Sequence, residues 1–588
     1  MKKQRHPFPQ MSRKGYRLLD GEWKFKADKE NLGEAENWFE GLETDEKILV
    51  PFACESAMSG ISCECAPKNI WYEKTLFLSK EEIAESVLLW FEGVDYTAKI
   101  WINGHFVGSH DGAYTAFSFD IAFFVREGEN LLVVKAEDGY RLENPRGKQR
   151  WLNKSYSCWY VPTTGIWKSV FLEFTGNVRF EKIKWTPDVN TQTLKAEFFL
   201  NDYRCGLSII LSIFREGREE KFLKSAIGST YHCIIIDLRS AEEEFQVKHW
   251  SAETPDLYEV KAVLEMDGKP KDEIESYFGF REFCSEKGAL TINGAPVYQK
   301  LVLYQGYWKD TGLTPPSDEA IEKDLKDIKR MGFNGIRVHQ KIESEYFLSC
   351  ADKLGLYVWC EMPSAHAFND DMKDKLIAEW SEIVRQKYNH PSIVVWVPFN
   401  ESWGIRGVRR NKEMQSFADA AYYLTKAYDS MRPVVTNDGW EHVKTDIVTV
   451  HNYEQNPECL NRAYRSRESA MSEWDAVRHQ KFIFSEGYEY EGQPVIISEY
   501  GGIAFMNGLS GNDWGYSAVA TEDDFCARYQ ELCAAIKRIG YVCGYCYTQF
   551  SDVWQEKNGF VTMDRKYKVD PAKIGRINAE CISVEDIK

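Results

Sequence analysis

Two glutamates close short apolar segments of this chain. Glu401 ends the segment 393–401, and Glu499 follows the segment 495–498. Short β-branched runs bounded by turn-forming residues predict buried parallel strands, so each carboxylate should lie where a strand opens into a loop. Two carboxylates that face each other across one pocket suit hydrolysis of a glycosidic bond. In that reaction one protonates the leaving oxygen and the other attacks or stabilises the anomeric carbon.

The elements that position these glutamates begin near residue 290, where apolar strands alternate with amphipathic helices. A helix is expected to start at 315–317, since Ile321, Leu325 and Ile328 recur at helical spacing. Alternation of this kind predicts a (β/α)8 TIM barrel over residues 284–588, with its chemistry at the carboxyl ends of the strands. The eight predicted strands lie near 297–304, 333–338, 356–360, 393–397, 434–437, 447–450, 495–498 and 542–547.

Several polar and aromatic residues fall at or near these strand ends and are candidates for binding substrate. Arg337 could hold Glu499 ionised or brace the barrel, and Glu361 could grip a hydroxyl or pair with Arg337. Each histidine is either a ligand for hydroxyls or a structural hydrogen bonder, and each tryptophan is either a stacking platform or a packed core residue. The candidates are Asn400, Arg337, His339, Glu361, Trp403, His451, Tyr453, Tyr547 and Trp308.

The first half of the chain is predicted to form two β-sandwiches. Alternating runs up to residue 176, with a hairpin signal at Asn103-Gly104, indicate an antiparallel, jelly-roll-like sandwich over 1–176. Further strands over 177–283 are enough for an immunoglobulin-like sandwich.

Composition excludes several classes of partner. A formal charge of −17 argues against nucleic acid and anionic membranes, which need basic patches. No apolar run reaches the length of a membrane span, and the segment 1–16 lacks the apolar stretch of a signal peptide, so we expect a cytoplasmic protein. The 15 cysteines are scattered and show no paired chelating motif. We therefore expect reduced thiols, no metal site and no cofactor.

Longer motifs give a resemblance to a known family. The segments 400–404, Asn-Glu-Ser-Trp-Gly, and 498–502, Ser-Glu-Tyr-Gly-Gly, resemble the paired signatures of glycoside hydrolase family 2. The segments 145–149, 163–167 and 278–282 resemble that family's sugar-binding sandwich and its junctions, and 290–294 resembles the beginning of its barrel. The resemblance covers nearly the whole chain.

The resemblance implies a retaining exo-β-glycosidase that acts on terminal non-reducing sugars. Glu401 would be the acid/base and Glu499 the nucleophile, with their carboxyl groups roughly 5 to 5.5 Å apart. Asn400 would hydrogen-bond the 2-hydroxyl of the sugar. The family offers a magnesium site near the catalytic residues, but the sequence shows no defined set of oxygen ligands. A carbohydrate is the expected partner, and homo-oligomerisation is left open.

Departures from the family pattern concern the sugar. Tyr547 replaces the usual tryptophan of the eighth strand, and 337–341 replaces the usual Arg-Thr-Ser-His-Tyr-Pro. We expect a β-galactosidase-like enzyme, with α-L-arabinosidase activity as a neighbour. Glu556 stands where family glucuronidases carry an asparagine, which disfavours glucuronides unless Lys557 turns inward. The alternatives are a β-glucuronidase and a catalytically silent carbohydrate-binding protein.

Overall fold

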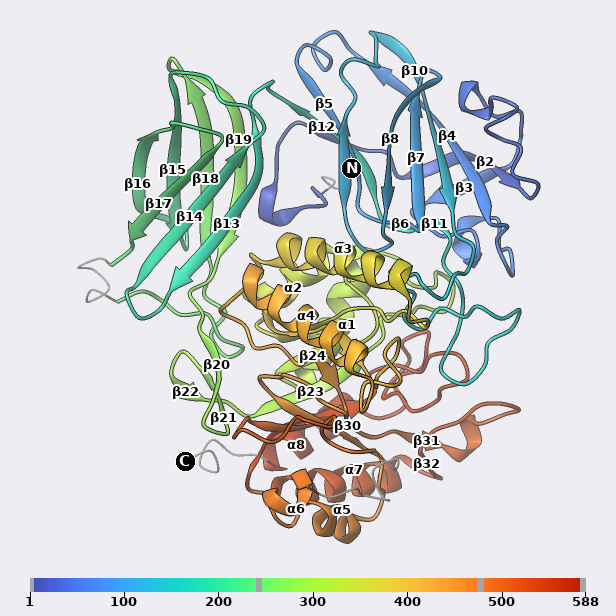
Figure 1. Cartoon of the computed structure of the whole chain (residues 1–588), viewed down its shortest axis with the longest axis vertical. Helices are drawn as coiled ribbons and strands as arrows, with labels where there is room; N and C mark the ends of the chain where they lie inside the picture. Colours follow the sequence, from blue (N-terminus) through green and yellow to red (C-terminus); the bar gives the residue numbers. More distant parts are fainter. Residues whose placement is uncertain (1–4, 240–245, 473–480, 582–588) are drawn as a thin grey trace.

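The computed structural model describes residues 5–239, 246–472 and 481–581. Two β-sandwiches lie side by side in the upper half of Figure 1, and an α/β barrel fills the lower half. Within the described residues, no helix is both long enough and apolar enough to cross a membrane.

The N-terminal sandwich packs a four-stranded sheet on a six-stranded one. In β10, the alternate residues Leu132, Val134 and Ala136 are fully buried in the core of the sandwich. The hairpin predicted at Asn103 forms between β7 and β8, with positive φ at Asn103 and Gly104. The strands, in the order of the two sheets and with the small β11–β6 pair last, are β1 (Tyr16–Leu18), β12 (Val170–Thr175), β5 (Ser86–Phe91) and β9 (Phe117–Asp120); β3 (Lys47–Val50), β2 (Gly21–Asp28), β4 (Asn69–Leu78), β10 (Gly128–Glu137), β7 (Thr97–Ile102) and β8 (His105–Asp111); and β11 (Gly165–Ile166) and β6 (Val94–Asp95).

The second sandwich packs a three-stranded sheet on a four-stranded one around a core of its own. A small three-stranded sheet then leads into the barrel. The strands are β13 (Phe180–Asp188), β14 (Thr193–Leu200) and β17 (Tyr231–Asp237); β16 (Arg218–Ala226), β15 (Leu207–Arg215), β18 (Tyr258–Met266) and β19 (Lys269–Phe278); and β20 (Phe283–Glu286), β21 (Ala289–Ile292) and β22 (Ala295–Pro296).

The barrel is built on a curled parallel sheet of seven strands, in the order β26-β25-β24-β23-β33-β30-β29. The predicted fifth strand is shorter than expected. Val434 makes only an isolated bridge to Trp396, and the regular pairing begins at β28, which pairs with β27 beyond the end of β26. The strands are β23 (Gln299–Tyr304), β24 (Gly335–Val338), β25 (Tyr357–Glu361), β26 (Ile393–Val397), β27 (Phe399–Asn400), β28 (Asn437–Asp438), β29 (Val448–Asn452), β30 (Val495–Gly501), β33 (Val542–Thr548) and the small pair β31 (Ile503–Phe505) and β32 (Ser517–Val519).

Helices cover the outside of this sheet. The helix predicted after 315–317 begins at Asp318, because the side chain of Ser317 accepts a hydrogen bond from the amide of Ala320. Its apolar face, Ile321, Leu325 and Ile328, is buried against the barrel. The helices are α1 (Asp318–Arg330), α2 (Glu345–Leu354), α3 (Asp370–Lys387), α4 (Lys412–Tyr428), α5 (Pro457–Ala463), α6 (Arg467–Ser472), α7 (Glu522–Lys537) and α8 (Pro571–Cys581).

Candidate active site

The two glutamates come from different kinds of backbone. Glu401 directly follows β27, and its amide donates to the carbonyl of Asp438 over 2.9 Å. Glu401 and Ser402 have φ of 51° and 60°, in the left-handed region where residues other than glycine are strained, as is common at functional sites. Glu499 lies inside β30 rather than after it, because Tyr500 and Gly501 continue the pairing with β33.

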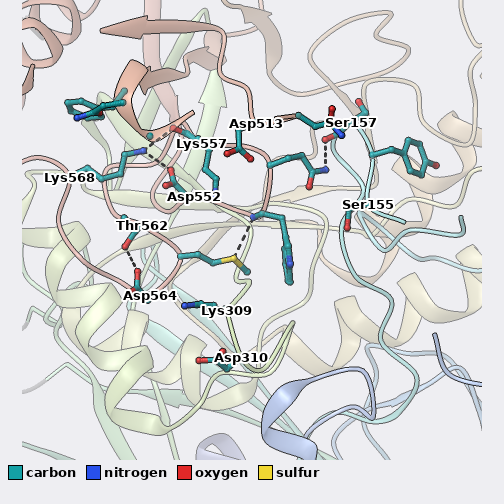
Figure 2. Close-up of a pocket in the computed structure, with 18 of the residues that line it drawn as sticks. Ser155, Ser157, Lys309, Asp310, Asp513, Asp552, Lys557, Thr562, Asp564 and Lys568 are labelled. Atoms are coloured by element: carbon teal, nitrogen blue, oxygen red, sulfur yellow. Dashed lines mark hydrogen bonds and ion pairs between the residues drawn. The ribbon is translucent and has the colours of Figure 1, made fainter. Parts of the chain in front are cut away.

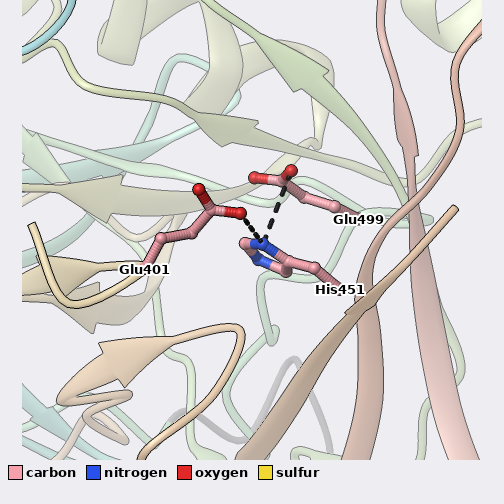
Figure 3. A group of neighbouring side chains, drawn as sticks. All are labelled: Glu401, His451 and Glu499. Atoms are coloured by element: carbon pink, nitrogen blue, oxygen red, sulfur yellow. Dashed lines mark hydrogen bonds and ion pairs between the residues drawn. The ribbon is translucent and has the colours of Figure 1, made fainter. Parts of the chain in front are cut away.

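One histidine joins the two carboxyl groups. His451 Nδ1 lies 2.7 Å from Glu401 Oε1 and 3.5 Å from Glu499 Oε2, as the dashed lines in Figure 3 show. One oxygen of each glutamate and one nitrogen of His451 all lie within 4.8 Å of one another. The other ring nitrogen is 2.8 Å from Asp438 Oδ2. The carboxyl groups therefore share one wall of a single site.

Cationic neighbours keep Glu499 ionised. Burial alone would raise the pKa of Glu499, but His451 and Arg337 lower it to about 2. Arg337 is fully buried, and its Nη1 lies 2.6 Å from Glu499 Oε1. The hydroxyl of Tyr453 donates to Glu499 Oε2. Glu499 is thus an oriented carboxylate, which is the state that a nucleophile needs.

His451 itself is held in its charged form. Burial would lower the pKa of His451, but Glu499 and Asp438 raise it to about 10. Both ring nitrogens of an imidazolium carry protons, so His451 can donate to a carboxylate on each side. Glu401, His451 and Glu499 also have ligand types and a spacing that could hold a metal ion.

Asn400 has an unused donor. Its Oδ1 accepts from Arg337 Nη2 over 2.7 Å, which fixes the orientation of the amide. Its buried Nδ2 has no partner among the described residues, and the side chain borders the cavity beside Glu401. An unpaired buried donor is costly, so a ligand oxygen at this place would bind well.

The structure brings most of the predicted residues together: some line the cavity and others lie behind them. His339, Asn400, Glu401, Trp403, Tyr453 and Glu499 line the cavity. Arg337, His451 and Glu361 lie behind them. Glu361 is fully buried, with Oε2 accepting from Arg337 Nε over 2.9 Å and Oε1 accepting from Gln340 Nε2 over 2.7 Å. Of the two roles considered for Glu361, its position fits pairing with Arg337.

Tyr547 and Trp308 are not brought to the cavity. Side chains of a strand alternate between its two faces, and Thr548 is the residue of β33 that lines the cavity. Tyr547 therefore points into the helix layer, where it is fully buried, accepts from the amide of Ile503 and packs on Phe560. Trp308 is buried beneath the guanidinium of Arg565, whose Cζ is 3.7 Å from the ring centroid. Both residues have packing roles.

Seven lining residues were not among the predicted site residues: Lys148, Cys158, Leu303, Trp514, Tyr516, Thr548 and Glu556. Glu556 had been marked by its position against family glucuronidases, and Lys148 falls within the motif 145–149. Leu303 and Thr548 lie near the carboxyl ends of β23 and β33, where their residue types gave no functional signal. Cys158, Trp514 and Tyr516 come from segments whose approach to the cavity carries no local sequence signal.

Lys148 reaches the barrel from the N-terminal sandwich. The amides of Arg146 and Gly147 both donate to the carbonyl of Ser364 over 3.0 Å, which pins the loop to the barrel rim. Burial lowers the pKa of Lys148, but Glu556 and more distant acids outweigh that effect and raise it. Lys148 Nζ lies 3.8 Å from Glu556 Oε2. A cation and an anion thus border the cavity together.

Comparison with known proteins points to the same family along nearly the whole chain. Three models match consecutive parts of the chain: the sugar binding domain of glycosyl hydrolases family 2 over residues 16–176, a second domain of that family over 178–281, and its TIM barrel domain over 285–564. A putative beta-glucuronidase of Formosa agariphila is 26% identical over 446 residues, which cover 74% of this chain and 50% of that protein. A beta-galactosidase of Leuconostoc mesenteroides is 27% identical over 458 residues, covering 73% of this chain and 40% of that protein.

Solved structures share the whole architecture. A β-glucuronidase from Ruminococcus gnavus in complex with D-glucuronic acid superimposes with a TM-score of 0.78 at 17% identity, covering 98% of this chain and 99% of that one. At that identity the likeness shows the fold alone. The chain spans half or less of the length of the two curated relatives above. The matched domains nevertheless follow one another in the family's order over nearly all of this chain, which belongs to glycosyl hydrolase family 2.

Proposed function

We propose that the protein is a retaining exo-β-glycosidase that removes terminal sugars by double displacement. The observation that carries the proposal is the short separation of Glu401 and Glu499, with His451 contacting both. Retaining enzymes hold their two carboxyl groups about 5 to 5.5 Å apart, whereas inverting enzymes leave roughly 6.5 to 9.5 Å for a water molecule. An oxygen of each glutamate within 4.8 Å of the other favours the first class.

In the first step, Glu499 attacks the anomeric carbon while Glu401 gives its proton to the glycosidic oxygen. The bond from the anomeric carbon to that oxygen breaks, the aglycone leaves, and the sugar stays bound to a Glu499 oxygen as an ester. Asn400 Nδ2 is free to donate to a sugar hydroxyl, and Arg337 holds the other end of that amide.

In the second step, the Glu401 carboxylate takes a proton from water, whose oxygen attacks the anomeric carbon on the face opposite the ester. Glu499 leaves as a carboxylate, and two inversions leave the configuration unchanged. His451 contacts both carboxyl groups, so the charge of one is felt by the other.

For the sugar we propose a neutral hexoside, β-galactoside before β-glucuronide. Glu556 borders the cavity, and a second carboxylate brought close to it would cost up to several kcal/mol. Lys557 does not turn inward, since it lines a different surface. α-L-Arabinosides share the ring stereochemistry of β-galactosides and are expected neighbours.

The second candidate is a β-glucuronidase. Lys148 is a buried cation at the cavity and could pair with a uronate carboxylate. One curated relative is named a putative beta-glucuronidase and another a beta-galactosidase, so names do not separate the two candidates.

The test is kcat/KM for the 4-nitrophenyl β-galactoside, α-L-arabinoside, β-glucoside and β-glucuronide, with Glu499→Ala as the inactive control. We expect the galactoside to lead. A clear preference for the glucuronide selects the second candidate, and no turnover of any glycoside selects a silent binding protein. The cytoplasmic location and the absence of nucleic-acid and membrane partners stay predictions from composition and sequence pattern.

A further inference from the structure

A groove of about 1430 Å³ lies beside the catalytic cavity. Figure 2 shows Lys309 and Asp310 on one side of it and Lys557 and Asp513 on the other. Pockets for drug-sized ligands measure about 300 to 1000 Å³, so this groove has room for a chain of several sugar units. None of its lining residues takes part in the mechanism above.

The groove and the cavity share one wall. The amide of Trp514 donates to the carbonyl of Gln555, and the amide of Lys557 donates to the carbonyl of Trp514, each over 2.8 Å. Neighbouring residues in extended backbone face opposite sides. Accordingly Trp514 and Glu556 line the cavity, whereas Asp513, Gln555 and Lys557 line the groove.

A second shared wall comes from the loop of the N-terminal sandwich. Cys158 lines the cavity, and Ser155, Tyr156 and Ser157 line the groove. Gln555 Nε2 donates to the carbonyl of Ser157 over 2.7 Å, which ties the two walls together. The same two short segments therefore face the terminal sugar on one side and the groove on the other.

Aromatic rings connect the acid/base with the groove. Trp403, which lines the cavity with Glu401, has its ring centroid 5.6 Å from that of Trp159. Trp159 in turn stacks on Tyr156 with centroids 5.2 Å apart. The aglycone leaves from the side of the acid/base, so this row of rings leads it towards the groove.

The lining of the groove suits a glycan. A sugar ring offers an apolar face of C–H groups and a rim of hydroxyls, and half-buried aromatic rings suit such a face. Trp554 and Phe505 line the groove, and each is held by another ring: Trp554 stacks on Tyr160 at 5.8 Å and Phe505 on Phe525 at 5.5 Å.

Polar groups in the groove are free to bind hydroxyls. Within the described residues, the side chains of Lys309, Lys557, Asn507 and Asn512 have no hydrogen-bond partner in the protein. Several acids of the groove are already paired, as Asp552 is with Lys568 at 2.7 Å. Among the described residues the Asp310 carboxylate has no hydrogen-bond partner either, so the available groups include both donors and acceptors, which match the hydroxyls of a sugar.

We propose that the groove binds the aglycone side of an oligosaccharide. The substrate is then the terminal β-linked sugar of a glycan of several units rather than a glycoside with a small aglycone. This inference rests on the proposed glycosidase function and adds a second binding site to it.

The test compares two substrates in two variants, one with a pair of substitutions and one with a single substitution. Lys309→Ala with Lys557→Ala removes the free cations, and Trp554→Ala, made separately, removes an aromatic face. The substrates are 4-nitrophenyl β-galactoside and β-1,4-galactotriose. We expect kcat/KM for the triose to fall about tenfold or more in both variants, mainly through KM, with the aryl galactoside changed less than twofold. Binding of the triose to the same variants in a Glu499→Ala background, measured by calorimetry, should weaken by a similar factor.

The matched control is Lys29→Ala with Lys80→Ala, two exposed lysines of the N-terminal sandwich. It should leave both substrates unchanged. Equal losses on both substrates in the groove variants, or triose binding as tight as in the parent Glu499→Ala protein, would overturn the inference. Failure of the proposed function looks different, because the wild-type protein would then hydrolyse neither substrate while the binding measurement still tests the groove.

Discussion

Replacing Glu401 by glutamine removes the proton that the leaving group needs while keeping the size of the side chain. We expect kcat/KM for alkyl glycosides to fall by roughly 10² to 10⁴. For 2,4-dinitrophenyl glycosides the loss in the glycosylation step should be much smaller, because that leaving group departs without protonation. Steady-state kinetics over a series of leaving groups checks this, and an equal loss for good and poor leaving groups would remove Glu401 from the role.

Replacing His451 by asparagine removes a positive charge beside the nucleophile. His451 and Arg337 hold the pKa of Glu499 at about 2, so the loss of the imidazolium should raise that pKa. A nucleophile with a higher pKa becomes protonated at higher pH. The acid limb of the kcat/KM profile, measured with a 2,4-dinitrophenyl glycoside, should therefore move towards neutral pH.

The control for this prediction is His110→Asn, because His110 lies by Glu382 and far from the cavity residues. Its acid limb should match that of the wild type. An unshifted limb in His451→Asn would show that another group sets the charge of Glu499.

Residues close to a strand end could be predicted from the sequence, and others could not. Glu401, Asn400, Arg337 and His339 each follow or end an apolar run, and parallel strands bring such positions to one rim. Lys148 has no such signal. It reaches the cavity only because its loop is pinned to Ser364 of a distant segment.

At the scale of elements, we expect the two loops that bring Lys148 and Glu556 to the cavity to determine which sugar is preferred. Glu556→Gln should raise the ratio of kcat/KM for glucuronide over galactoside, on the order of tenfold, because a like-charge contact is removed. Lys148→Met should lower the same ratio. The two substitutions act in opposite directions on one measured quantity, so parallel changes would show that neither residue faces the distal part of the sugar.

Strand existence was easier to predict than strand extent. The segment 434–437 is apolar enough for a strand, yet Val434 makes only a bridge, and regular pairing begins at Asn437 through β27. Glu499 was expected after its strand, but β30 runs on to Gly501. The sequence also did not show on which face of β33 Tyr547 lies, because a tyrosine suits both a substrate cavity and a packed helix layer.

At the scale of the molecule, one buried acid joins the N-terminal sandwich to the barrel. Glu379 of α3 accepts from the amide of Tyr114 over 2.7 Å, and its other oxygen has no partner among the described residues. Burial raises the pKa of Glu379 from 4.5 to about 8. The folded protein thus binds this proton more tightly than the unfolded chain. The resulting stability is fully present below pH 4.5 and is lost as the pH rises through about 8.

Glu379→Gln stays neutral at every pH, so its melting temperature should exceed that of the wild type at pH 8.5 and match it near pH 4.5. Glu382→Gln, on the same helix, is the control. Burial raises the pKa of Glu382, but His110 outweighs it and leaves the pKa lowered, so the wild-type carboxylate stabilises above pH 4.5. Because the pKa of Glu382 is not raised, that variant should show no gain in melting temperature over the wild type at pH 8.5, and a gain equal to that of Glu379→Gln would contradict this account.

The architecture could be predicted because each part of the sequence has a recognisable pattern: apolar residues alternate in the sandwiches, and strands alternate with helices in the barrel. The way in which the sandwiches pack on the barrel could not be predicted, because contacts such as that of Tyr114 with Glu379 join surfaces that carry no periodic pattern.

The central claim is that Glu499 carries the sugar in a covalent intermediate. Incubation with 2,4-dinitrophenyl 2-deoxy-2-fluoro-β-galactoside slows the second step, so the intermediate should accumulate and can be mapped by mass spectrometry of peptides. The account predicts one sugar per chain, attached to Glu499, and no label in Glu499→Ala. A label on another residue, or turnover of a fully active enzyme with no label at all, would contradict it.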